Sequence, residues 1–396
     1  MLYAANRVNT FDLLEALIQE WCIMGKETLK KQVIELFESA DIYPNRDRPW
    51  DIQIHNPDFY SRVLNGGSLA LGESYMDGWW DCNSLDQFFE QITRAKLEDK
   101  VKSNLQLLSR FIILKFANLQ TKKNAFNIAK THYNLGNTLF EIMLDSRLIY
   151  SCAYWKNADN LEDAQLHKLD LICKKLLLAP GMRLLDIGCG FGALAIHAAK
   201  NYGADVVGIT VSKEQYDIAT QRAQGLPVKI QLSDYRDLEG RFDRVVSVGM
   251  FEHVGPLNYR EYMQKAHDCL TEDGLFLLHT IGSNTSNVET DAWINKYIFP
   301  NSVLPSVTQI SEAFKTLFIM EDWHNFGADY DKTLMAWRSN FEQGWDMLKA
   351  DYDERFYRMW CYYLSSCAGL FRAREIQLWQ IVLSKHGVEG GYQSLR

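Results

Sequence analysis

Glycines at alternate positions follow a short apolar run near the middle of the chain. The run Leu184–Ile187 leads into Gly188, Cys189, Gly190 and then Gly192, and a helical pattern follows. Glycine has no side chain to obstruct a ligand, so such a turn lets a ligand pass close to the backbone. A dinucleotide fingerprint, G-x-G-x-x-G, places its third glycine one residue later. The spacing G-x-G-x-G therefore favours the methionine end of S-adenosylmethionine over a pyrophosphate.

The residues after the next two predicted strands bear on the same choice. A dinucleotide site needs an acidic residue about 20 positions beyond its glycines, to bind the ribose hydroxyl groups. Thr210 occupies that position here, so an NAD-dependent oxidoreductase is disfavoured. Thr210 and Gln215 are the alternative partners for a ribose. Further along, Asp234 and Tyr235 supply an acid and an aromatic ring for an adenine.

A second group of residues has the types needed for acid–base chemistry. Glu252 and His279 each follow a predicted strand, and the carboxyl ends of parallel strands meet at one edge of a sheet. Cys152 lies upstream, in the aromatic segment Leu148–Trp155, which we expect to cover the site. Taken singly, Cys152 also fits a buried small apolar residue, and His279 fits a core histidine. Their joint occurrence favours a site.

The elements that must position these residues alternate along the second half of the chain. Strands alternating with helices of 10–13 residues predict a parallel sheet covered by helices on both faces. We therefore predict an α/β, doubly wound, Rossmann-like sheet of the class I S-adenosylmethionine-dependent methyltransferases, with a smaller N-terminal mixed or helical domain. The predicted strands are 183–187, 206–210, 228–232, 242–248 and 275–280, with 318–323 and 377–384 as edge strands; the predicted helices are 193–202, 212–223 and 258–270.

The first third of the chain divides by composition. Residues 1–93 show helical periodicity at 11–18 and 29–37, an extended stretch at 52–55, and a glycine-rich and aromatic stretch, 66–80, that predicts a tight turn. Residues 94–130 contain nine Lys and Arg against two acids and predict a basic helical linker, with one apolar helix face at 111–116. Such an excess attracts an anionic membrane surface, although a solvated helix explains it as well. Residues 131–396 form the predicted catalytic domain.

Composition excludes several classes of protein. The 396 residues carry a net charge of −8, which argues against nucleic-acid binding. The eight cysteines have no metal-binding spacing, so we expect no metal and free thiols in a reducing cytoplasm. We see no signal peptide and no apolar run of the roughly 20 residues that a membrane span requires.

Several stretches, in order along nearly the whole chain, resemble the bacterial cyclopropane-fatty-acyl-phospholipid synthases. They are LGESYMDGWW, HYNLGN, YSCAYW, LLDIGCG, MFEHVGPLNY, HTIGS, WINKYIFPN, DWHNFGADY and FRAREIQLWQ. The resemblance implies transfer of a methylene group from S-adenosylmethionine to the cis double bond of an unsaturated phospholipid acyl chain. It further implies a carbocation that bound bicarbonate deprotonates. The N-terminal domain is then expected to dock on lipid, in a homodimer associated peripherally with the inner face of the cytoplasmic membrane.

The resemblance also implies roles for individual residues. Glu252 is unusual among the residues that the resemblance implies as bicarbonate ligands, because its carboxylate would repel the anion unless one of the two carries a proton. We therefore expect Glu252 to share a proton with bicarbonate or to orient His279. Cys367 is expected near the site or simply packed. The implied bicarbonate ligands are Cys152, Glu252, His279, Tyr330 and the backbone of Ile281, and the implied donor-binding residues are Tyr150, Ser151, Gly188, Cys189, Gly190, Thr210, Gln215, Tyr235 and Arg236.

Two alternatives stay open at this point. One is a methyltransferase that uses the same cation but leaves a methyl-branched or hydroxylated chain. The other is a lipid-surface protein whose donor site is vestigial, which the intact glycine turn disfavours.

Overall fold

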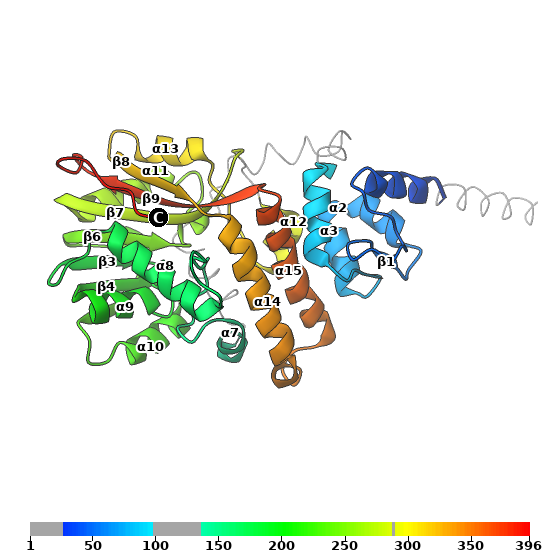
Figure 1. Cartoon of the computed structure of the whole chain (residues 1–396), viewed down its shortest axis with the longest axis horizontal. Coiled ribbons are helices and arrows are strands. Elements are labelled where there is room, and N and C mark those ends of the chain that lie inside the picture. The colour runs from blue at the N-terminus through cyan, green and yellow to red at the C-terminus, as the bar shows by residue number, and fades with distance from the viewer. Residues whose placement is uncertain (1–26, 98–135, 287–289) are drawn as a thin grey trace, which may run out of the picture.

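A computed structural model describes residues 27–97, 136–286 and 290–396. The described chain has two parts: a helix-covered sheet, and an N-terminal module of residues 27–97 that packs at one side of it (Figure 1). Two long helices, α14 (Ala328–Leu348) and α15 (Glu354–Arg372), stand between them. The predicted stretches 11–18 and 111–116, and most of the predicted linker 94–130, lie outside the described residues.

The main sheet has seven strands in the order β5-β4-β3-β6-β7-β9-β8. The first five are parallel, and β9 is antiparallel to both of its neighbours. This arrangement confirms the predicted doubly wound α/β sheet. The strands are β3 (Arg183–Ile187), β4 (Asp205–Thr210), β5 (Val228–Leu232), β6 (Phe242–Val248), β7 (Leu270–Ser283), β8 (Ile319–Asn325) and β9 (Ile376–Ser384).

Helices cover both faces of this sheet because alternate strand residues are apolar on each side. On one face Leu184, Val206 and Val246 pack against α8 (Leu161–Lys175) and α9 (Ala193–Tyr202). On the other face Leu185 and Val245 pack against α11 (Tyr259–Cys269) and α13 (Val307–Phe314). The other helices of this part are α7 (Asn137–Met143), α10 (Lys213–Arg222), α12 (Ala292–Tyr297) and the single turns η2 (Tyr235–Asp237) and η3 (Phe251–His253).

One prediction about these elements was wrong, and one helix was not predicted. The strand predicted at 377–384 is not at an edge of the sheet: β9 lies between β7 and β8, and only β8 is an edge strand. The stretch 66–80 contains the predicted tight turn, but its residues up to Met76 belong to α2 (Phe59–Met76), which was not predicted. The helix kinks at Gly67, whose φ of 55° only glycine adopts readily, and the turn comes later, at 77–79.

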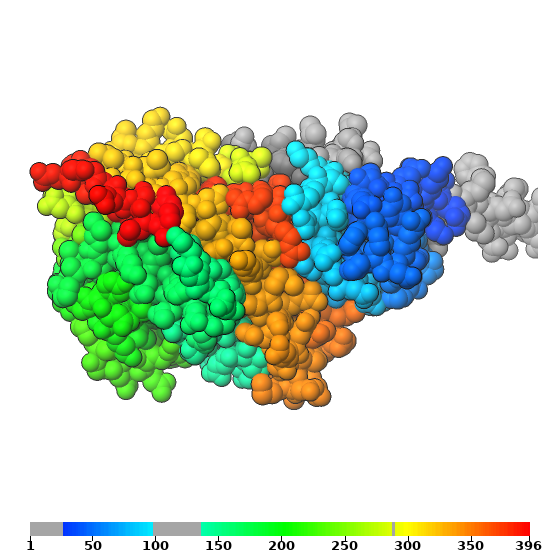
Figure 2. Space-filling view, viewed as in Figure 1, coloured from blue at the N-terminus to red at the C-terminus, as the bar shows by residue number. Residues whose placement is uncertain are grey.

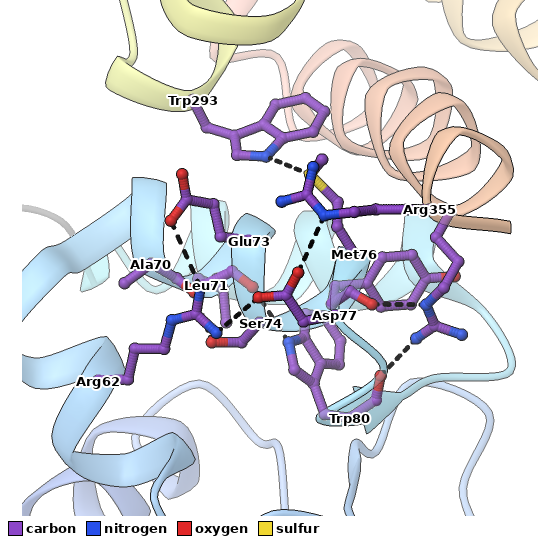
Figure 3. Close-up of polar contacts among 12 residues, drawn as sticks. Arg62, Ala70, Leu71, Glu73, Ser74, Met76, Asp77, Trp80, Trp293 and Arg355 are labelled. Carbon is purple, nitrogen blue, oxygen red and sulfur yellow. Dashed lines mark hydrogen bonds and ion pairs between the residues drawn. The ribbon is translucent and has the colours of Figure 1, made fainter. Parts of the chain in front are cut away.

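The N-terminal module consists of a helical stretch at 27–38, α2, α3 (Leu85–Arg94) and a two-stranded sheet of β1 (Gln53–Ile54) and β2 (Trp80–Asp81). Figure 2 shows this module (blue to cyan) against the red-orange α15. Arg355 donates to Asp77 at 3.0 Å, and the Trp293 indole nitrogen donates to the Met76 sulfur at 3.3 Å (Figure 3). Apolar and charged contacts therefore join the module to α12 and α15.

A membrane-spanning helix would have to be both long and apolar. None of the helices in the part of the chain that the structure describes meets that condition.

Candidate active site

The nine residues predicted to bind the donor line a single pocket at the carboxyl ends of β3, β4, β5 and β6. Its polar lining also includes Asp234, the acid predicted beside the adenine, and Lys168, Asp186 and Ser233, which were not predicted as donor-binding residues. The predicted residues in the lining are Tyr150, Ser151, Gly188, Cys189, Gly190, Thr210, Gln215, Tyr235 and Arg236.

The glycine turn has the backbone that its sequence predicts. Gly188 and Gly190 have φ values of 87° and 55°, in the left-handed region that favours glycine. A Cβ atom at Gly188 would lie 3.0 Å from the side chain of Met250, which also lines the pocket. The amides of Gly188 and Cys189 donate to the carbonyl oxygen of Ile209, which fixes the turn against β4. Both the conformation and the available space therefore require glycine at position 188.

Most of the remaining polar side chains of the pocket are paired within the chain. Thr210 Oγ1 donates to Gln215 Oε1 at 2.8 Å, and both side chains are buried. Arg236 donates to the carboxylate of Asp234 at 3.0 Å and stacks over the ring of Tyr235. These contacts hold the predicted ribose and adenine partners in place before a ligand arrives.

The residues predicted to act on the acceptor lie outside the pocket lining; the structure brings Cys152, Glu252, Tyr330 and the Ile281 amide together, whereas the side chain of His279 contacts Gln380 and Phe326. We call Cys152, Glu252, His279, Tyr330 and the Ile281 amide the acid–base cluster. The Ile281 amide donates to Glu252 Oε1 at 2.6 Å, so in this structure it already has a partner. Cys152 and Glu252 lie near Tyr330. When ionised, their negative charges oppose ionisation of the phenol and so raise its pKa. The cluster draws on β7, α14, η3 and the segment before α8.

Two atoms of the acid–base cluster are buried without a hydrogen-bond partner among the described residues: Glu252 Oε2 and His279 Nε2. His279 Nδ1 lies 3.2 Å from the amide nitrogen of Gln380, on β9. Gln380, rather than Glu252, is thus the hydrogen-bond partner of the imidazole. An unpartnered buried polar atom is destabilising by about 1–3 kcal/mol, and a small polar ligand would relieve that.

Burial controls the charge of this cluster. It raises the pKa of Glu252 to about 7, although the hydrogen bond from Ile281 opposes the shift. Burial also raises the pKa of the Cys152 thiol and the Tyr330 phenol well above their ordinary values, so both stay protonated near neutral pH. The pKa of His279 is well below its ordinary value, because of burial and nearby Lys168, so its imidazole is neutral.

Cys367 lies close to the cluster, and its charge too contributes to raising the pKa of Tyr330. Burial raises the pKa of its own thiol to about 12, which leaves it protonated. The ring of Tyr330 stacks on Phe371 at 4.6 Å, and the Tyr150 and Tyr363 hydroxyl groups lie 2.9 Å apart. Cys367, Tyr363 and Phe371 all belong to α15, which therefore borders both the donor pocket and the acid–base cluster.

Sequence reasoning missed Lys168, Asp186 and Gln380. For Lys168 a signal existed: Leu161, Gln165, Lys168, Ile172 and Lys175 share one helical stripe, and all five are buried. Polar residues on a stripe that faces the core usually have a specific partner. Among the residues described, no group of three or more His, Cys, Asp and Glu could hold a metal ion.

Comparison with known proteins identifies the family to which the chain belongs. Residues 120–381 match the family model described as mycolic acid cyclopropane synthetase. The chain belongs to this cyclopropane synthetase family. It is 56% identical over 362 residues, 91% of this chain and 94% of the relative, to a cyclopropane-fatty-acyl-phospholipid synthase of Escherichia coli K12. It is also 40% identical over 274 residues, 65% of this chain and 69% of the relative, to a probable fatty acid methyltransferase of Pseudomonas putida.

Solved structures agree with this assignment. The cyclopropane synthase MmaA2 of Mycobacterium tuberculosis has a TM-score of 0.62 at 33% identity, over 66% of this chain and 98% of that one. The mycolic acid cyclopropane synthase CmaA1, complexed with SAH and CTAB, has the same TM-score at 32% identity, over the same shares of the two chains. The chain is therefore an enzyme with the class I fold of the S-adenosylmethionine-dependent methyltransferases.

Proposed function

We propose that this enzyme transfers a methylene group from S-adenosylmethionine to the cis double bond of an unsaturated phospholipid acyl chain, forming a cyclopropane ring. The observation that carries the proposal is the acid–base cluster beside the donor pocket, with Glu252 Oε2 and His279 Nε2 buried and unpartnered in the described structure. The relative of 56% identity, which spans 91% of the chain, bears the name of this activity.

The chemistry of the acceptor explains why both groups of residues are needed. An isolated alkene is a weak nucleophile, so the sulfonium of the donor must supply the driving force. Methyl transfer leaves a carbocation, and ring closure requires loss of a proton from the transferred methyl group. Water must be kept out, since it would capture the cation as an alcohol. The aromatic rings of Tyr330 and Phe371, stacked at 4.6 Å, would stabilise a positive charge that develops beside them.

Bicarbonate fits the acid–base cluster. The Tyr330 phenol and the His279 imidazole are neutral near pH 7 and can each donate a hydrogen bond to an oxyanion. The Cys152 thiol is also neutral, but it donates to the Ala153 carbonyl oxygen at 3.2 Å and would have to rotate to reach the anion. Glu252, with its pKa raised to about 7, can carry a proton and so avoid repelling the anion. When bound, bicarbonate would supply the base that accepts the proton from the transferred methyl group.

The proposal is tested with vesicles of monounsaturated phosphatidylethanolamine or phosphatidylglycerol, methyl-labelled S-adenosylmethionine and bicarbonate. We expect a labelled acyl chain heavier by one CH₂, read by gas chromatography–mass spectrometry. A methylene branch has the same mass, so NMR of the ring protons must show the cyclopropane. An unchanged lipid, with donor binding confirmed separately, would show that the acceptor is wrong.

We also propose that the enzyme docks on the anionic inner face of the cytoplasmic membrane as a homodimer, through residues 1–93 and the basic segment 94–130. The excess of positive charge in that segment supports the docking, at about 1 kcal/mol per basic residue near the surface. Reversing Lys122 and Lys123 to Glu should weaken binding to anionic vesicles in a salt-sensitive way. Unchanged binding would place the docking surface elsewhere, and sedimentation equilibrium tests the dimer.

A further inference from the structure

Helix α8 presents two polar side chains to the backbone segment that precedes it. Gln165 Nε2 donates to the Ser151 carbonyl oxygen at 2.9 Å, and Lys168 Nζ donates to Ser151 Oγ at 2.8 Å. Gln165 is fully buried and Lys168 is 2% exposed. Positions three apart on a helix lie on one face, so a single face of α8 binds Ser151 at both its backbone and its side chain.

The position of Ser151 makes this contact relevant to the reaction. Tyr150 and Ser151 line the donor pocket, and the next residue, Cys152, belongs to the acid–base cluster. A shift of this segment would thus move residues of both groups together. Because an error of 1 Å in the position of a reacting group can slow a reaction 100-fold, a residue that fixes the segment affects the rate without touching the acceptor.

We propose that Lys168 is a positioning residue for the reaction: its buried amine, bonded to Ser151 Oγ, fixes the Tyr150–Cys152 segment between the donor pocket and the acid–base cluster. The inference rests on the proposed function. It adds a residue, on the helix before the first strand of the main sheet, that the predicted donor and acceptor sets did not contain.

Lys168 also sets the charge at the pocket. The titratable groups whose charges act on it, or on which it acts, are Asp145, Cys152, Asp186 and His279. Burial lowers the pKa of Lys168 to about 8 and raises that of Asp186 to about 7, while the charge of Lys168 opposes the rise at Asp186. Asp186 lines the pocket, and its Oδ2 is buried without a hydrogen-bond partner in the described part of the chain. Its carboxylate would attract the positive sulfonium and ammonium groups of the donor.

The first test is a double-mutant cycle on donor binding, measured by calorimetry without any acceptor. Lys168→Met and Ser151→Ala remove the two ends of one hydrogen bond. We expect each to raise the donor Kd about 10-fold, and the double variant to be no weaker than the worse single one. Fully additive effects, or a Lys168→Met Kd within twofold of the parent, would overturn the proposal.

A matched control lies on the same helix. Lys175 is also fully buried, but it contacts Asp322 and His324 and lies two turns from Lys168. Lys175→Met should lower the melting temperature as Lys168→Met does, yet leave the donor Kd within twofold. An equal loss of donor affinity in both variants would show that Lys168 acts only through stability.

The pH profile gives a readout that a merely structural role would not move. Donor affinity should rise with pH as Asp186 ionises, and the pH midpoint of this rise reports the pKa of Asp186. Loss of the Lys168 charge should shift the midpoint upward in Lys168→Met but not in Lys175→Met. The same midpoint in all three proteins would overturn the charge role. Since no acceptor is present, these results are independent of whether the parent enzyme converts lipid, which tests the proposed function.

Discussion

The donor pocket and the acid–base cluster adjoin each other but differ in how their polar groups are paired. In the pocket, Thr210 is bonded to Gln215 and Arg236 to Asp234, while single atoms of Asp186, Tyr235 and His253 are buried without a partner among the described residues. In the cluster, Glu252 Oε2 and His279 Nε2 are buried with no partner in the described structure. The comparison teaches that the pocket combines fixed side-chain pairs with open polar atoms spread over a large ligand site, whereas the two open atoms of the cluster suit a small polar ligand. Variants of the pocket should weaken donor binding, and variants of the cluster should stop the chemistry.

The largest effect is expected from Glu252→Gln. The amide cannot share a proton with an anion as the carboxyl group can, so kcat on lipid should fall about 100- to 10,000-fold, the range of general acid–base catalysis. The donor Kd should stay within threefold, because Glu252 is not in the pocket lining. Labelled-product assays and calorimetry on the same preparation check both values. A large loss of donor binding would show that the two groups do not act separately.

Gly188→Ala tests the pocket, and here we expect weaker donor binding with little change in kcat. A φ of 87° is strained for alanine, and the new Cβ would press on Met250 at 3.0 Å. Strain of this kind is about 1–3 kcal/mol, so we expect the donor Kd to rise about 10- to 100-fold. At saturating donor, kcat should change much less. Gly190→Ala is the control, since it has a positive φ but nothing within 4 Å of its Cβ.

Asp186→Asn sharpens the comparison. Asp186 lines the pocket, but like Glu252 of the cluster it is a buried carboxyl group with an unpartnered oxygen among the described residues and a raised pKa. Its pKa is about 7 in the folded protein, against an ordinary value of 3.8 in the unfolded chain. Between these values the folded state keeps a proton that the unfolded state has lost, so stability falls as pH rises from about 4 to 7. The Asn variant should lack this fall and, without donor, be more stable at pH 8 by roughly 1–3 kcal/mol. Urea unfolding at several pH values measures it; an unchanged pH slope would contradict the assignment.

The smallest effect is expected from Thr210→Val, which removes the bond to Gln215 but keeps the shape of the side chain. A single neutral hydrogen bond contributes about 0.5–1.5 kcal/mol, so the donor Kd should rise about 2- to 10-fold with kcat unchanged. Calorimetric titration of the donor is sensitive enough to detect this. A loss as large as that of Gly188→Ala would mean that Thr210 contacts the donor directly through more than one group.

Local pattern predicted most of the sheet but not its final order. The bounds of β3, β5, β6 and α9 agree with the prediction, because apolar runs and glycine signals occur within each segment. The position of β9 between β7 and β8 depends on pairing between distant segments, for which the sequence has no local signal. Helix α2 was missed because Gly66 and Gly67 suggest a turn. Its later turns contact α12, where Gly72 leaves room for the indole of Trp293.

The candidate site shows the same division. The glycine turn and the residues after each strand are local signals, and the structure places all nine predicted donor-binding residues in one pocket. The partners that orient them are not local signals: Gln380 reaches His279 across 101 residues of sequence, and Lys168 is one of several polar residues on α8. Which polar side chain turns inward is decided by tertiary packing, so periodicity alone could not select it.

The insertion of β9 and the packing of α15 on the N-terminal module also bear on how the chain is made. Arg372 of α15 pairs with Asp86 of α3, 286 residues earlier in the sequence. At 5–20 residues per second, a ribosome needs roughly 15–60 s to synthesise that interval. Throughout that time the module lacks its partner helix, and β7, which is made later, lacks β9 while the roughly 90 residues between them are synthesised. Nascent chains therefore expose an apolar module surface and an open strand edge until synthesis is nearly complete, which makes this a protein whose folding in the cell should depend on chaperones.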